Sequence, residues 1–122
     1  MIQGYVNANY EAVISLVIKN QGKLKSITAV IDTGFTGFLS LPQREIEELG
    51  LPWSYRDRAT LGDGSETLFD IYGAAIIWNG DYQDIEVNSA ETEPLLGMQL
   101  LRGYHLQIDA VEGGLVVIKK LT

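Results

Sequence analysis

The residue best suited to chemistry is Asp32, in the run Ala-Val-Ile-Asp-Thr-Gly at residues 29–34. It ends an apolar stretch, where a buried charge is costly unless it is paired or hydrogen-bonded. The next two residues meet that need: Thr33 carries a hydroxyl donor, and Gly34 lets the backbone turn and bring its N–H close to the carboxylate. A carboxylate held in this way can transfer protons as a general acid or base. The alternative is a strand that ends in an ordinary turn, because Asp, Thr and Gly are all turn residues.

The other reactive side chains are weaker candidates for a catalytic or metal-binding role. His105 is the only histidine and there is no cysteine, so we expect no metal site and no cofactor. Ser40, Ser65 and Ser89 have no base nearby in sequence, and serine-hydrolase chemistry needs one. The chemistry of this chain therefore depends on Asp32.

Strands dominate the elements that must position this carboxylate. Residues 12–18 are apolar at every even position, and residues 24–32 resume that alternation after a turn at 20–23. A short strand is predicted at 38–41, and Pro42 begins a short helix that Gly50 ends.

Turn residues divide the second half of the chain in the same way. Gly-Asp-Gly-Ser at 62–65 predicts a hairpin between two strands, and Asn79-Gly80 predicts another. We expect the remaining elements at 55–61, 67–78, 82–88, 95–102 (a short helix), 106–108 and 115–119. The fold class is all-β: a small closed, barrel-like domain with one or two short helices, spanning residues 1–122 as a single unit.

The composition argues against some classes of binding partner and indicates a cellular location. No apolar run approaches ~20 residues, so we expect no membrane span, and residues 1–10 do not read as a secretory signal. A net charge of −7 with nine scattered basic residues argues against nucleic acid, which needs a basic face. The absence of cysteine suits a reducing cytosol, so a cytoplasmic location is expected.

Three motifs in order resemble the retropepsin-like (retroviral-type, clan AA) aspartic proteases, and most closely their small bacterial and archaeal members. The first is apolar-apolar-Asp-Thr-Gly followed by the strand at 38–41. The second is the glycine-rich hairpin tip at 61–65, where that family has its substrate-covering flap. The third is Pro-Leu-Leu-Gly at 94–97 followed by an apolar segment. The resemblance covers roughly residues 24–108.

The resemblance implies an aspartic endopeptidase that acts on a peptide or protein substrate. It assigns catalysis to Asp32, Thr33 and Gly34. The residues that it implies for substrate contact are Phe35, Gly62, Asp63, Gly64 and Ser65. In this family two carboxylates share one proton: one takes a proton from a water molecule, and the other donates to the scissile carbonyl. Only one Asp-Thr-Gly occurs here, so the second carboxylate must come from another copy across a two-fold axis, in a homodimer.

The chain departs from the family pattern in two places. Phe35 stands where the family has a small residue, and its ring is expected to narrow the cleft or reshape one substrate pocket. Thr36 and Met98 stand where viral members carry an acidic residue and an arginine that form a dimer-supporting ion pair.

Two alternatives remain open. The same fold can serve as a catalytically inactive module for dimerisation or peptide binding, a reading that Phe35 favours. An unrelated small β-barrel would have Asp-Thr-Gly as an ordinary turn, and such a barrel needs no partner copy.

Overall fold

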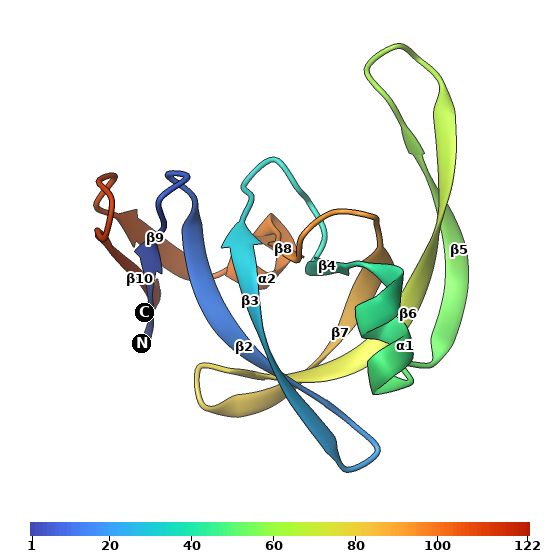
Figure 1. The fold of residues 1–122 in the computed structure, drawn as a ribbon, viewed down its shortest axis with the longest axis horizontal. Coiled ribbons are helices and arrows are strands. Elements are labelled where there is room, and N and C mark those ends of the chain that lie inside the picture. Colours follow the sequence, from blue (N-terminus) through green and yellow to red (C-terminus); the bar gives the residue numbers. More distant parts are fainter.

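The computed structural model describes residues 1–122 and contains ten strands and two short helices (Figure 1). In chain order the elements are β1 Ile2–Val6, β2 Ala12–Asn20, β3 Lys23–Ile31, β4 Leu39–Leu41, α1 Gln43–Leu49, β5 Trp53–Thr60, β6 Glu66–Trp78, β7 Asp81–Ser89, β8 Leu95–Leu96, α2 Met98–Leu101, β9 Tyr104–Ile108 and β10 Leu115–Lys120.

All strands belong to one sheet, and part of that sheet closes on itself. The ring runs β2-β3-β8-β4-β7-β6 and returns to β2 through a β6–β2 pairing. β1, β10 and β9 extend the sheet from β2, and β5 extends it from β6. Most neighbours are antiparallel, whereas β3–β8 and β4–β7 are parallel. The predicted all-β fold with two short helices is confirmed, and the ring brings the end of β3 beside β8.

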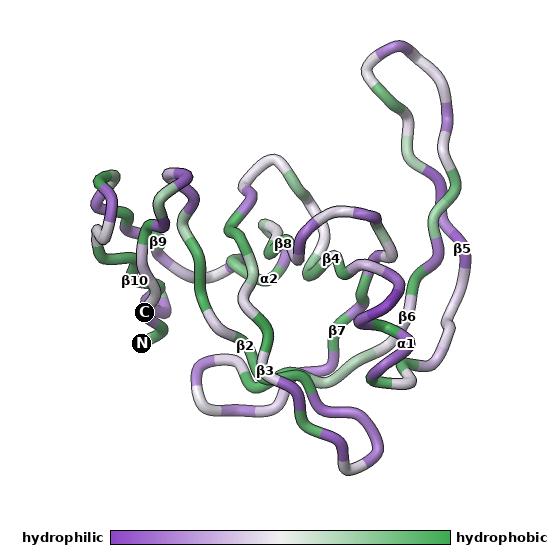
Figure 2. The backbone as a smooth tube through the Cα atoms, viewed as in Figure 1, coloured by the Kyte–Doolittle hydropathy of each residue, from purple (hydrophilic) through white to green (hydrophobic).

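The core lies inside this ring. The even-numbered side chains of β2 at Ala12, Ile14, Leu16 and Ile18 are all buried, as the period-two pattern predicted. They pack in a single cluster of 22 buried apolar residues contributed by both halves of the chain. Figure 2 shows hydrophobic stretches along β2 and β3 and hydrophilic ones in their hairpin. Burial of this apolar surface is the main force that holds the ring together.

The predicted turns are present where the sequence placed them. Helix α1 follows Pro42 and ends at Gly50, which adopts a left-handed φ of 62°. Asn79 and Gly80 both have positive φ in the turn between β6 and β7, as a tight hairpin turn requires.

Two sequence expectations need correction. No strand was expected at residues 1–10, yet β1 pairs with both β2 and β10. Its backbone approaches β2 closely, because a Cβ on Gly4 would lie 2.0 Å from the carbonyl oxygen of Val13. The helix expected at 95–102 is shorter, since Leu95 and Leu96 pair with β3 and β4 as strand β8. Neither helix has the length and apolar character that crossing a membrane would require.

Candidate active site

Asp32 lies immediately beyond the last residue of β3 and is half-buried. Its N–H donates to the carbonyl oxygen of Leu96 at 2.9 Å, which ties it to β8. Its Oδ1 accepts the N–H of Gly34 at 2.9 Å. Asp32 is therefore held at two points: the neighbouring strand holds its backbone, and the turn that follows holds one of its carboxylate oxygens.

The first turn of α2 supports the loop that follows Asp32. The N–H groups of Gly97, Met98 and Gln99 donate to the carbonyls of loop residues 35–38, at 2.8–3.1 Å. A Cβ on Gly97 would lie 2.2 Å from the carbonyl oxygen of Gly37, so only glycine allows this approach. Loop and helix therefore form one packed unit.

Phe35 fits into this unit. Its ring lies against Gly37 and Gly97, where added Cβ atoms would come within 2.7 Å of ring carbons. The ring is half-buried and lines the cleft beside Asp32. The large residue is accommodated by the missing side chains of two glycines.

A cleft of about 510 Å³ opens beside Asp32. Gly34 and Phe35 line it from the loop after Asp32, and Thr67, Leu68 and Phe69 line it from β6. The other side is lined by Ser40, Asn88, Ser89, Ala90, Thr92 and Leu95. Asp32 is the only charged residue in the lining. The cleft offers one carboxylate in a mostly apolar groove, a setting suited to an extended neutral ligand.

The expected flap residues do not line this cleft. Gly62, Asp63, Gly64 and Ser65 are exposed at the tip of the β5–β6 hairpin, which projects away from the ring (Figure 1). There Asp63 accepts hydrogen bonds from the hydroxyl of Ser65 at 2.5 Å and from its N–H at 2.9 Å. The Ser65 hydroxyl, followed by its N–H, lowers the pKa of Asp63. The tip thus has its own internal hydrogen bonds, and residues 67–69 are the part of the hairpin that reaches the cleft.

Thr33 faces a different hollow. It lines an apolar depression of about 390 Å³ together with Val6, Tyr10, Ile31 and Ile108. Tyr10 is 71% exposed and Ile108 is 40% exposed. The Asp-Thr-Gly motif therefore separates a cleft on the Asp32 side from an exposed apolar surface on the Thr33 side.

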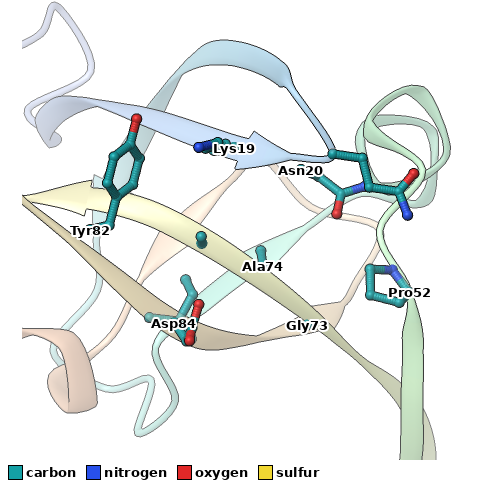
Figure 3. Close-up of a pocket in the computed structure, with 10 residues that line it drawn as sticks. Lys19, Asn20, Pro52, Gly73, Ala74, Tyr82 and Asp84 are labelled. Atoms are coloured by element: carbon teal, nitrogen blue, oxygen red, sulfur yellow. The ribbon is translucent and has the colours of Figure 1, made fainter.

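A third hollow of about 530 Å³ lies where β2, β6 and β7 meet (Figure 3). At one end the ammonium of Lys19 lies 4.8 Å from the centre of the Tyr82 ring. At the other, the Asn20 amide donates to the carbonyls of Leu49 and Gly50. Its polar groups hold neighbouring elements together, and it contains none of the residues around Asp32.

Several lining residues of the Asp32 cleft were not singled out from the sequence as binding residues. Asn88 and Ser40 carry a usable signal, since each is a polar residue next to core residues in an alternating strand. Leu68 and Phe69 carry none, because apolar residues in a strand are expected in the core.

Comparison with known proteins places the fold. No protein-family model matches the chain, and no curated protein matches its sequence. Among solved structures, it is similar to a retropepsin-like aspartic protease from Rickettsia conorii. The two share 19% identity with a TM-score of 0.65, over 99% of this chain and 91% of that one. The chain therefore has the retropepsin-like fold that its motifs predicted.

Proposed function

We propose that this protein is an aspartic endopeptidase that acts as a homodimer, with Asp32 as its catalytic carboxylate. The observation that carries the proposal is the position of Asp32 in a largely apolar cleft, with one oxygen held by the Gly34 N–H. A turn without function has no need of a cleft beside its carboxylate. Incubation of a peptide library with the protein at acidic and at neutral pH should give cleavage products. Binding without cleavage under all conditions would favour the inactive module instead.

The chemistry follows from two Asp32 carboxylates that face each other. Like charges this close cannot both ionise, so the pair shares one proton and titrates as a unit. The ionised partner takes a proton from the water between them as its oxygen attacks the peptide carbonyl carbon. The protonated partner donates to the carbonyl oxygen. The tetrahedral intermediate collapses when the first carboxyl gives its proton to the leaving nitrogen and the C–N bond breaks. The second carboxylate takes back the hydroxyl proton, so the pair again shares one proton and no covalent bond to the protein forms.

A second copy is part of the proposal because the chain has one Asp-Thr-Gly. The exposed apolar surface beside Thr33 supports it, because such a surface is a common site of protein–protein contact. Tyr10, Ile108 and Val111 are all exposed and belong to the β1–β2 turn or to the end of β9 and the turn that follows it. These two turns lie at the same edge of the molecule (Figure 1). A two-fold axis close to Thr33 would cover these residues and bring the two Asp32 side chains together.

Ile108→Glu should weaken the dimer by at least about tenfold in Kd, because it places a carboxylate in the apolar contact of each copy. Sedimentation equilibrium at micromolar concentration measures this constant, and peptide cleavage should fall in parallel. Leu24→Glu is the matched control, since Leu24 is 62% exposed in the β2–β3 hairpin at the opposite end of the molecule. A wild-type protein that is active and monomeric at every concentration would contradict the two-chain site.

The hairpin tip should close over bound peptide. Residues 61–66 are all exposed and belong to a hairpin whose strand β5 has no outer neighbour, so their amides should exchange fastest in the free protein. Hydrogen exchange with a peptide-like inhibitor should show protection appearing at 61–66. The turn at 20–23 should stay unchanged as an internal control. Strong protection of the tip without inhibitor would argue against a closing motion.

A further inference from the structure

The sheet beneath the cleft presents a row of side chains to it. Strand register places Ser40 of β4 beside Asn88 of β7 on one side and Leu95 of β8 on the other. All three line the cleft. The preceding row on the same strands points into the core and consists of Leu39, Val87 and Leu96. Because side chains alternate along a strand, Ser40 and Asn88 form the floor of the cleft.

The Ser40 hydroxyl has no hydrogen-bond partner. The residue is 3% exposed, and its Oγ is buried without a donor or acceptor within reach. The neighbouring serine on β7 differs, because the Ser89 hydroxyl donates to Oε1 of Gln43 at 2.8 Å. A buried hydroxyl left unpaired is unfavourable and calls for an explanation. The side-chain amide of Asn88, next to it, also makes no hydrogen bond within the chain.

The residues around the cleft restrict which ligand groups could hydrogen-bond to Ser40 and Asn88. The walls above the floor are apolar and include Phe35, Leu68, Phe69 and Leu95. A carboxylate entering the cleft would face Asp32 with no cation to balance either charge. An ammonium would be drawn to Asp32, the one charged group of the lining, and at the floor it would gain only a hydroxyl and an amide in exchange for its water. A carboxamide on an apolar stem fits best, since it both donates and accepts, as Ser40 and Asn88 do.

We propose that Ser40 and Asn88 form a polar-floored subsite that selects a glutamine side chain of the peptide substrate. The inference rests on the proposed peptidase function and names the substrate class of that cleft. Both are specificity residues: they contact the substrate side chain, and Asp32 does the chemistry.

Peptides that carry glutamine, norleucine or glutamate in turn at each position around the cleaved bond test the subsite. At one position, kcat/KM for glutamine should exceed that for norleucine by about tenfold, and glutamate should be disfavoured. Ser40→Ala should bring the glutamine-to-norleucine ratio close to one, as should Asn88→Leu, which removes the amide at similar size. Ser15→Ala, at an exposed position on β2, should keep the ratio.

Thermal melts separate recognition from a structural role. Ser40→Ala should melt at the same temperature as the wild type or higher, because it removes an unpaired buried hydroxyl. A lower melting temperature with an unchanged ratio would overturn the subsite.

Binding measurements distinguish failure of the subsite from failure of the peptidase. Calorimetry measures the Kd of the same peptides, made with a reduced bond that cannot be cleaved, for the Asp32→Asn protein. Cleavage without glutamine preference would overturn the subsite and leave the peptidase standing. Absence of any cleavage would overturn the peptidase. The subsite would then stand if glutamine peptides bind about tenfold tighter and Ser40→Ala removes that difference, and would fall otherwise.

Discussion

Asp32→Asn should abolish peptide hydrolysis while leaving the protein folded and dimeric. The amide can neither take a proton from water nor share the proton of the pair. Loss of one essential catalytic group raises the barrier by more than about 4 kcal/mol, which is roughly a thousandfold or more in kcat. Steady-state cleavage of a single peptide measures the loss. Asp81→Asn makes the same change of charge at an exposed position on β7 and should retain full activity.

The same variant should be as stable as the wild type or more so. Its Oδ1 can still accept the Gly34 N–H, which in the wild type lies 2.9 Å from Asp32. Two facing amides do not repel as two carboxylates do, and functional sites are commonly held at some expense of stability. Asp32→Ala lacks the acceptor and should be about 1 kcal/mol less stable than Asp32→Asn. Thermal melts between about pH 4 and pH 8 compare the three proteins.

A structural role for Asp32 predicts the reverse. A carboxylate retained only for the turn would lose a charge-assisted hydrogen bond in the Asn variant, and the melting temperature would fall by an amount equivalent to about 1–3 kcal/mol. A destabilised Asn variant, together with a wild type that cleaves nothing, would exclude the peptidase and leave the fold unaffected.

Gly97→Ala should destabilise the protein by about 3 kcal/mol or more, a drop of roughly 10 °C in Tm. The added methyl group would lie 2.2 Å from the carbonyl oxygen of Gly37 and 2.7 Å from that of Phe35. These are backbone atoms, so α2 must move away from the loop that follows Asp32 and loses the hydrogen bonds from its first N–H groups. Activity should fall with stability, because that loop holds Asp32.

Two further variants show which contact makes Gly97→Ala unstable. Gly73→Ala is the matched control: its nearest neighbour would be Cγ of Pro52 at 3.9 Å, so we expect a change within about 0.5 kcal/mol. Adding Phe35→Ala to Gly97→Ala removes the ring but leaves both carbonyl oxygens in place. The double variant should therefore remain unstable. Recovery to wild-type stability would show that the ring, not the backbone, requires glycine at position 97.

The sequence alone determined much of the local structure and pointed to one candidate residue for chemistry. Alternation in residues 12–18 predicted β2, and Gly50 predicted the end of α1, because burial period and backbone freedom are local properties. The same reasoning singled out Asp32, since a carboxylate at the end of an apolar strand needs hydrogen-bond donors. Of the two expected donors, the Gly34 N–H reaches Asp32, whereas Thr33 lines a different hollow. The motif order also predicted the retropepsin-like fold, which the solved structure from Rickettsia conorii supports.

Tertiary structure alone decided which residues share the cleft. Ser40 and Asn88 lie far apart in the sequence, and only the parallel register of β4 and β7 places them side by side. The hairpin contributes Leu68 and Phe69 to the cleft, whereas the polar tip that the sequence favoured stays exposed. Strand β1 was not predicted because it is defined by its pairing with β2 and β10, and the close approach of Gly4 to Val13 is a contact between two strands of the sheet. Such proximity is set by pairing between distant segments, which no local pattern encodes.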